Sequence, residues 1–261
     1  MTAISYIFLR TMWKFLVPVM VSVLAFPSIC QVKTPQPTPV KKPFAESLQA
    51  VVVTTEAPGS SQGKARLFER KSATSGWKQT GAEFPVVLGR NGLGWSADSA
   101  PAGIADIKKE GDGRSPAGLM PLTFAFGRPD SPSEVKLSYV KLEEYSECVD
   151  DMSSSHYNRL VDRLKVGSFD WKTSEKMLEV GQEYDLGIFV AHNSYPVRTG
   201  NGSCIFLHIW QDPMTGTSGC TAMARENLQR ILAWADPAKS PYLIQLTKAD
   251  RKRYRKAWNL P

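Results

Sequence analysis

Two residues of the chain, His208 and Cys220, have the types and spacing of a catalytic base and its nucleophile. They stand in the segment HIWQDPMTGTSGCTAM, where a Thr-Ser-Gly run leads into the cysteine. A neutral imidazole can take the proton of a thiol, and the thiolate can then attack a carbonyl carbon. Backbone N–H groups at Gly219, Cys220 and Thr221 are candidates for binding the resulting oxyanion, because a glycine lets the backbone approach a substrate closely. The segment is therefore a candidate for covalent catalysis by Cys220 with His208 as its base, and a structural role for both residues is the alternative.

The stretches on either side of this pair are expected to position it. The apolar run CIFLHIW, residues 204–210, is typical of a buried strand, so His208 is expected at a strand end near the site. After Cys220, ARENLQRILAWADP has apolar residues at the three-and-four spacing of a helix face, and Pro237 ends it. These apolar residues are Leu228, Ile231, Leu232 and Ala235. We expect Cys220 just ahead of this helix, where free N–H groups and the helix dipole favour a thiolate.

Strand-like runs, most of them bounded by Gly, Pro, Asn or Asp, recur along the chain after its first 47 residues. They cover residues 48–55, 65–70, 84–88, 119–126, 139–142, 186–191 and 204–210. Helical patterns are fewer, and a second one is expected at 154–164. With 261 residues and 42% hydrophobic content, the chain can bury a sizeable core. The sequence predicts one domain over residues 48–247, mainly β with a few helices (α+β), without internal repeats.

The N-terminus has the pattern of an export signal. Two basic residues, Arg10 and Lys14, precede an apolar run of about a dozen residues, 15–26. This run is shorter than the roughly 20 residues that a membrane span needs. We expect residues 1–30 to be a cleaved signal peptide, with an uncleaved anchor or lipidation at Cys30 as alternatives. Residues 31–47, rich in proline, are expected to form a linker. The protein is then exported, to the periplasm or the cell wall, and contacts the membrane only through the signal segment.

The formal net charge is +7, and much of it lies in the expected C-terminal tail, residues 248–261. Six Lys and Arg side chains there face a single acid, Asp250. A basic exported protein suits anionic envelope polymers as partners, and a solvated terminal helix is the alternative interpretation. No recognised nucleic-acid motif accompanies the charge, so we expect no nucleic-acid partner.

The cysteines and histidines also raise the alternative of a zinc site. The donors would be Cys204, His208 and Cys220, together with His192 or Cys148. There is no C-x-x-C pair, and two residues four apart on a strand point to one face at a long separation. We therefore expect no metal and no other cofactor. In an exported protein Cys148 and Cys204 are instead candidates for a disulfide, with two buried free thiols as the alternative.

Three segments together resemble the L,D-transpeptidase (YkuD-type) catalytic-domain family, whose signature is a histidine followed by a Ser/Thr-x-Gly-Cys segment. They are GDGRSPAGLMPLTFAFG (111–127), GSCIFLHIW (202–210) and TSGCTAM (217–223). The resemblance implies an L,D-transpeptidase-like β-sandwich with a helix following the nucleophile turn. It also implies that Cys220 attacks a peptidoglycan stem peptide, that His208 is the general base, and that Thr217 and Gly219 take the family's Ser/Thr and Gly positions.

Further residues are candidates for substrate contact. His192 and Asn193 stand at an expected strand end in a stretch that resembles the same family, with a structural role as the alternative for His192. Tyr157 lies near a loop expected to cover the site. The full set of candidates is His192, Asn193, Thr217, Tyr157 and Trp210.

The resemblance implies a reaction at the third residue of a tetrapeptide stem, a diamino acid. The cysteine attacks its carbonyl and expels the terminal D-Ala, giving an acyl-thioester. An amine then gives a cross-link or attachment, and water gives an L,D-carboxypeptidase; a non-catalytic cell-wall-binding module is the third alternative. The sequence departs from the common pattern at Ala222, where many members carry an arginine, at Ile209, and in a shorter His-to-Cys interval. These departures leave the acyl acceptor open.

Overall fold

The computed structural model describes residues 44–261. The expected signal peptide, residues 1–30, and most of the expected linker lie outside the described residues. Within the described part, no helix combines the length and apolar character needed to cross a bilayer.

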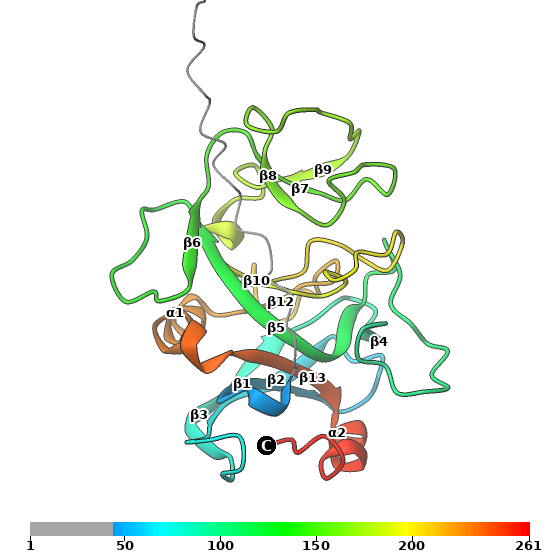
Figure 1. Ribbon diagram of the computed structural model, residues 1–261, viewed down its shortest axis with the longest axis vertical. Coiled ribbons are helices and arrows are strands. Elements are labelled where there is room, and N and C mark those ends of the chain that lie inside the picture. Colours follow the sequence, from blue (N-terminus) through cyan, green and yellow to red (C-terminus); the bar gives the residue numbers. More distant parts are fainter. Residues whose placement is uncertain (1–43) are drawn as a thin grey trace, which may run out of the picture. The chain divides into compact units, whose positions relative to one another are not determined.

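The elements of the described part follow one another in a mostly β order (Figure 1). They are η1 (Phe44–Glu46), β1 (Gln49–Thr55), β2 (Gln62–Glu69), β3 (Lys78–Val87), β4 (Leu93–Trp95), β5 (Ser115–Gly127), β6 (Ser138–Lys141), β7 (Ser146–Val149), β8 (Leu160–Asp162), β9 (Ser174–Lys176), η2 (Gln182–Tyr184), β10 (Leu186–Val190), β11 (Phe206–Ile209), β12 (Thr221–Met223), α1 (Arg225–Trp234), η3 (Pro237–Lys239), β13 (Tyr242–Thr247) and α2 (Lys248–Tyr254).

One ten-stranded sheet forms the body of the domain. Its order is β10-β11-β12-β3-β2-β1-β13-β5-β4, and β6 also pairs with β5. The long strand β5 pairs with β13 through residues 118–121 and with β10 through residues 122–127. Because β10 and β13 thus meet on the same strand, the sheet closes into a barrel. The predicted mainly β fold is confirmed, and one closed sheet takes the place of two separate layers.

The centre of the sheet is β1, which pairs in parallel with β13 and antiparallel with β2. All seven of its residues are buried, including the run Val51, Val52 and Val53. β-Branched side chains pack well on a pleated surface, and burial on both faces of a strand favours a continuous apolar run such as residues 50–53. α1 packs on β10 and β11 through Leu228, Ile231 and Leu232, which is the face that the sequence predicts.

A second, three-stranded sheet has the order β8-β7-β9. The helix predicted over residues 154–164 is wrong, because this stretch consists of turns followed by β8. The carboxylates of Asp151 and Asp170 accept backbone N–H groups of two serines in these turns. Such local side-chain acceptors compete with the hydrogen bonds of a helix. The segment therefore follows its turn chemistry rather than its apolar spacing.

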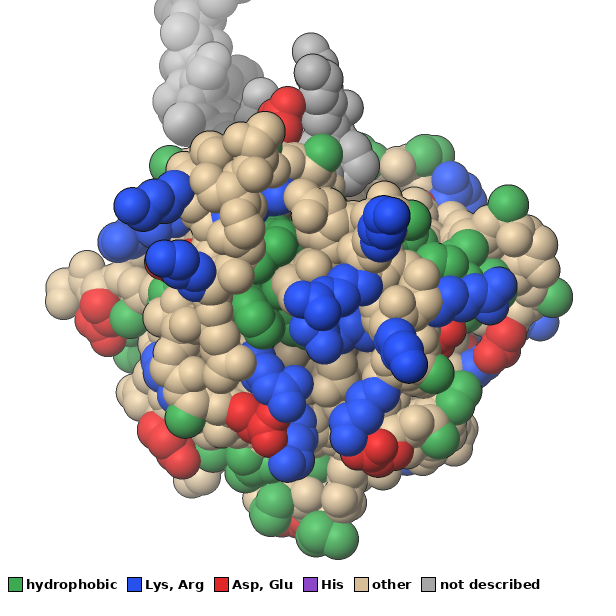
Figure 2. Space-filling model, turned by 90° about the horizontal axis from the view of Figure 1, so that it is seen from below, with side chains coloured by type: hydrophobic (Ala, Val, Ile, Leu, Met, Phe, Trp, Pro, Cys, Tyr) green, Lys and Arg blue, Asp and Glu red, His purple; other side chains and the backbone are tan. Residues whose placement is uncertain are grey.

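Both ends of the described part belong to the domain. Phe44 is buried and stacks on Trp77 at 5.5 Å between ring centroids, so residues 44–47, predicted as linker, are part of the fold. The predicted basic tail begins with α2, whose Tyr254 contacts the ring of Trp95 edge-on at 5.9 Å. Lys and Arg side chains gather on this end of the molecule, the lower end in Figure 1 (Figure 2).

Candidate active site

Neighbouring parallel strands bring His208 and Cys220 together. His208 lies on β11 and pairs with Ala222 of β12, and Cys220 directly precedes β12. Both residues line one pocket of about 520 Å³. Residues 210–219 connect β11 to Cys220, so two residues twelve positions apart in the sequence come to line the same pocket.

Cys220 is held as a buried thiol. Its side chain is about 6% exposed, and Sγ accepts the Phe206 N–H at 3.2 Å while lying 3.4 Å from the Cys204 carbonyl oxygen, which accepts its S–H. Burial raises the pKa of the Cys220 thiol, and the neighbouring Glu175 carboxylate raises it further. The expectation of a helix-stabilised thiolate is wrong, because β12 lies between Cys220 and α1. At neutral pH the nucleophile is a thiol.

His208 is held as a neutral imidazole. Its Nδ1 lies 2.8 Å from the Ile209 carbonyl oxygen. A carbonyl oxygen only accepts, so the proton is on Nδ1 and the other ring nitrogen, Nε2, is left to accept one. Burial lowers the pKa of His208 to about 4. The histidine therefore has the tautomer and the charge state of a general base.

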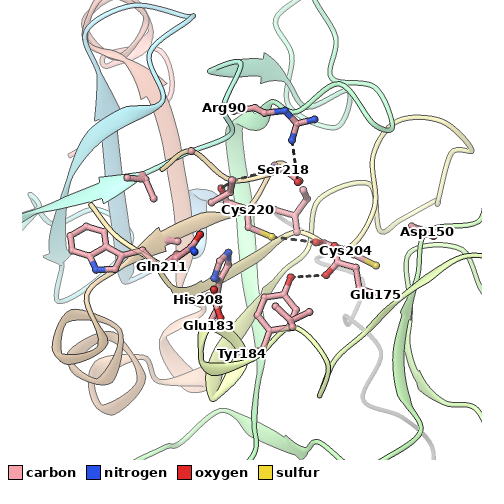
Figure 3. Close-up of a pocket in the computed structure, with 18 of the residues that line it drawn as sticks. Arg90, Asp150, Glu175, Glu183, Tyr184, Cys204, His208, Gln211, Ser218 and Cys220 are labelled. Atoms are coloured by element: carbon pink, nitrogen blue, oxygen red, sulfur yellow. Dashed lines mark hydrogen bonds between the residues drawn. The ribbon is translucent and has the colours of Figure 1, made fainter. Parts of the chain in front are cut away.

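In this resting geometry the thiol points away from its base. No hydrogen bond joins Cys220 and His208 in the part of the chain that the structure describes, because the S–H is engaged by Cys204 (Figure 3). Catalytic hydrogen bonds are often absent before substrate binds. A rotation of the cysteine side chain is the step that would bring the S–H to His208.

The nucleophile turn is fixed by its own hydrogen bonds. Thr217 Oγ1 donates to the Cys220 carbonyl at 2.6 Å and accepts the Gly219 N–H at 3.1 Å. Ser115 Oγ donates to the same carbonyl at 2.9 Å. A Cβ at Gly219 would lie 3.2 Å from the Arg114 carbonyl oxygen, so a side chain there would crowd the turn.

These bonds narrow the choice of oxyanion donor. The Gly219 N–H is already taken by Thr217, and Thr221 belongs to β12, paired with Leu207. No hydrogen bond within residues 44–261 engages the Cys220 N–H. Among the amides of Gly219 to Thr221 that the sequence offers as donors, the Cys220 N–H is therefore the one left available.

An acid–phenol pair that no sequence pattern indicates lies beside the cysteine. Tyr184 of η2 donates its hydroxyl proton to Glu175 of β9 at 2.6 Å, and its ring meets the His208 ring edge-on at 5.2 Å. Burial raises the pKa of Glu175 to about 7, and the charges of Asp150 and Glu110 add to this. Glu175 and Tyr184 come from separate elements of the chain, so no spacing in the sequence pointed to the pair.

Because Glu175 ionises near neutral pH, we expect Glu175→Gln to change the reactivity of Cys220 only at higher pH. Glutamine keeps an acceptor for Tyr184 but removes the charge that raises the pKa of the thiol. Alkylation by iodoacetamide should become about threefold faster or more at pH 8 to 9 and stay unchanged below pH 6, where Glu175 is protonated in the wild type. Intact-mass kinetics measure this, with the exposed Glu179→Gln as control. Equal rates for both variants across this range would contradict the assignment.

Two cations at the nucleophile turn were also missed. Arg90 lines the pocket and donates from Nη1 to Ser218 Oγ at 3.1 Å. Lys108 is buried in the pocket wall and forms an ion pair with Asp112 at 2.8 Å. Ala222, which stands where many family members carry an arginine, also lines the pocket. A guanidinium is thus present at the site, but it comes from the loop between β3 and β4.

Not all of the candidates for substrate contact reach the pocket. Thr217 and Trp210 line it. His192 is buried, with Nδ1 at 2.9 Å from Ser96 Oγ and Nε2 at 2.7 Å from the Asn201 carbonyl oxygen. Asn193 is buried as well and bonds to the Arg198 and Gly202 carbonyl groups. These two residues hold a loop in shape, so substrate contact by them is not supported.

Tyr157 also lies outside the pocket lining. Its hydroxyl donates to Glu110 Oε2, a residue that does border the pocket. Ser203 Oγ donates to the same carboxylate oxygen at 2.7 Å. Tyr157 therefore acts on the site only through Glu110.

A disulfide attaches the second sheet to the segment just before β11, the strand that carries His208. It joins Cys148 of β7 to Cys204, with 5.9 Å between the Cα atoms. Asn158 adds to this attachment by accepting the Cys204 N–H at 3.0 Å. Two donors of the alternative zinc site are consumed by the disulfide, and residues 44–261 contain no group of three or more His, Cys, Asp or Glu side chains placed to hold a metal.

We expect removal of this disulfide to destabilise the domain. The bond closes a loop of 56 residues, and in the Cys148→Ser/Cys204→Ser variant the unfolded chain regains that freedom. The free energy of unfolding should fall by about 2 to 4 kcal/mol, measured by urea titration. A dithiol added to the wild-type protein should give a similar shift, and an unchanged urea midpoint in both experiments would contradict this prediction.

The fold and the site define a class of protein: a mostly β domain that presents a cysteine and a histidine from neighbouring parallel strands in one pocket. A model of the L,D-transpeptidase catalytic domain (YkuD) matches residues 66–244, and the chain belongs to this family, as the sequence motifs predict. The match includes both His208 and Cys220.

Comparisons with individual proteins add little to the family assignment. No curated protein matches the chain. Among solved structures, the crystal structure of the helical cell shape determining protein Pgp2 from Campylobacter jejuni is similar, with 13% sequence identity and a TM-score of 0.38. The similarity covers 77% of this chain and 48% of that one, so this chain spans about half the length of Pgp2.

Proposed function

We propose that the protein is a peptidoglycan L,D-transpeptidase with Cys220 as its nucleophile. The observation that carries the proposal is that Cys220 and His208 line one pocket within the region matched by the family. A non-catalytic wall-binding module would not need a free thiol and a neutral histidine in the same pocket. The substrate class is the tetrapeptide stem, cleaved between its third residue and the terminal D-Ala.

The first half of the reaction forms an acyl-thioester. Cys220 turns from the Cys204 carbonyl, and His208 Nε2 takes the thiol proton as sulfur attacks the carbonyl carbon of the third residue. The Cys220 N–H binds the oxygen anion of the tetrahedral intermediate. When this intermediate collapses, the C–N bond to D-Ala breaks, and His208 returns its proton to the departing amine.

The second half transfers the acyl group. An amine of another stem gives up a proton to His208 and attacks the thioester, which forms an amide and restores the thiol. Because thiol and imidazole are both neutral at rest, the proton moves during each attack rather than beforehand. Water in place of the amine would give an L,D-carboxypeptidase, and Ala222 in the pocket wall is the departure from the family pattern that keeps this second candidate open.

Charges of both signs around Cys220 support a peptide substrate that carries both. Arg90 lies beyond Ser218 on one side of the cysteine, while Glu175 and Asp150 lie on another (Figure 3). Asp150 Oδ1 is buried without a hydrogen-bond partner among the described residues. In the proposed complex Arg90 binds the D-Ala carboxylate, and the two acids face the side-chain ammonium group of the third residue.

The decisive experiment is incubation of the full chain with defined disaccharide-tetrapeptides, followed by mass spectrometry. Dimers linked between two third residues are expected. If tripeptides are the only products, the protein is an L,D-carboxypeptidase rather than a transpeptidase. Unchanged substrate combined with retention on purified cell wall would replace both by a binding module.

The proposed substrate places the protein in the cell envelope, in the periplasm or at the wall. The disulfide supports this location, because disulfides persist in oxidising compartments. Cell fractionation tests it, and recovery of the protein with reduced Cys148 and Cys204 in the cytoplasmic fraction would contradict it.

A further inference from the structure

A second hollow of the described part lies at α2, and it shares no lining residue with the pocket of Cys220. One side of it carries four cations, Arg251, Lys252, Arg255 and Lys256. The other lining residues are Phe68, Gly76, Trp77, Asn259, Leu260 and Pro261. Lys and Arg side chains are gathered on the face that contains it (Figure 2).

The segment that carries the cations is firmly attached. Thr247 caps α2 by accepting the Asp250 N–H at 2.9 Å. Tyr254 and Trp258 stack at 4.6 Å between ring centroids, and both rings meet Trp95 edge-on. The apolar side of the segment thus packs on the barrel, and its basic side faces outward.

The four cations repel one another. Arg251 and Arg255, and likewise Lys252 and Lys256, are four residues apart, the spacing that places side chains next to each other on a helical turn. Burial lowers the pKa of Arg251, and the charges of Arg255 and Arg66 lower it further. α2 ends at Tyr254, and Arg255 and Lys256 follow it in a turn. A bound anion would reduce the repulsion among the four charges.

The nearby Asp and Glu side chains have other partners, and no ion pair described for residues 44–261 joins one of them to these four cations. Asp250 is bonded to the Thr247 hydroxyl, Glu56 pairs with Lys248, and Glu83 pairs with Lys64 and Arg66. Arg251 Nη2 donates to the Pro261 carbonyl, but its Nε is buried without a partner. An unpaired donor of this kind is costly, and acceptor oxygens of a ligand would satisfy it after a small rotation of the side chain.

We propose that this hollow binds a phosphate-bearing polyanionic polymer. The cations extend over about 7 Å along the segment, which fits successive phosphate groups better than a single ion. A membrane surface is the weaker partner, since the exposed large apolar side chains of the described residues lie elsewhere. They are Met152, Leu164, Phe169, Val180, Tyr195, Val197 and Met214. The location of this polymer in the cell envelope rests on the proposed function. The ability of the hollow to bind a phosphate-bearing polyanion does not depend on that function.

The test uses inorganic polyphosphate as the probe, with the full chain and calorimetry at low and high salt. In the variant Lys252→Glu/Arg255→Glu/Lys256→Glu the affinity should fall at least tenfold. Arg251 is left in place because it contacts Pro261. The control Lys136→Glu/Lys165→Glu/Lys172→Glu has the same change of net charge at exposed sites away from α2 and should lose less than threefold. Thermal unfolding and iodoacetamide labelling of Cys220 verify that both variants fold.

Several outcomes would overturn the proposal. Unchanged affinity in the α2 variant would do so, and so would equal losses in both variants, which would indicate net charge alone. Binding of anionic lipid vesicles without binding of polyphosphate would replace the polymer by a membrane, and equal affinity for orthophosphate would replace it by a single ion. The same titration with Cys220→Ala should give wild-type affinity, which separates this site from the proposed catalysis.

Discussion

Replacing Cys220 by alanine is expected to abolish product formation from disaccharide-tetrapeptides, a loss of about 10⁴-fold or more. Cys220 is the only unpaired cysteine among the described residues, and no other described side chain in the pocket can form the thioester. A carbapenem, whose strained amide acylates the same nucleophile, should give no covalent adduct with this variant. Intact-mass spectrometry measures the adduct, and assay of released D-Ala measures the reaction.

The alanine variant should remain folded, because alanine occupies the buried site of a small, neutral thiol. Loss of one sulfur from the core is expected to cost about 1 kcal/mol, which a thermal unfolding curve records. A carbapenem adduct or D-Ala release that persists in this folded variant would remove Cys220 from the proposed mechanism. Loss of the folded state would instead be resolved with Cys220→Ser, which keeps the shape and should be equally inactive toward the carbapenem.

Replacing His208 by glutamine is expected to lower kcat/KM by about 10² to 10⁴-fold, because the thiol loses its proton acceptor. The pH profile distinguishes this role from a structural one. Burial lowers the pKa of His208 to about 4, so the neutral, accepting form persists as the pH falls below 6.5. The acid limb of kcat/KM in the wild type should therefore lie near pH 4, and the remaining activity of the variant should lack it.

His156→Gln provides the matched control, since His156 lies outside the pocket lining. Its kinetics and acid limb should equal those of the wild type. An acid limb near pH 6.5 in the wild type, or one that remains near pH 4 in His208→Gln, would assign the titration to another group. Either result would separate His208 from the base.

The strand and helix patterns of the sequence predicted much of the barrel. Residues 48–55 and 119–126 fall within or beside β1 and β5, and the apolar spacing of Leu228, Ile231 and Leu232 gave α1 its buried face. The same spacing rule was wrong at residues 154–164. There, carboxylates of Asp151 and of the distant Asp170 take the backbone donors, and the second of these contacts exists only after the chain folds.

Some residues of the candidate site could likewise be predicted from the sequence, and others could not. Cys220 and His208 could be predicted because their types and the turn before the cysteine are visible in a short segment. Glu175, Tyr184 and Arg90 could not, since each is an ordinary residue in its own stretch and gains significance from its neighbours. His192 was a candidate for substrate contact because a histidine at a strand end has a suitable type and position. Its ring instead contacts Ser96 and Asn201, and it does not line the pocket.

The sequence by itself indicated the family to which the chain belongs and the proposed chemistry, with a thiol at Cys220 and a histidine twelve positions before it. Motifs achieve this because covalent chemistry requires particular side chains on locally encoded strands and turns. The tertiary structure alone decided the protonation states. Burial keeps Cys220 a thiol and His208 a neutral imidazole. β12 separates Cys220 from the N-terminus of α1, and the second sheet places Glu175 near the sulfur. A pKa depends on burial and on charges from distant parts of the chain, and both are set only when the fold is complete.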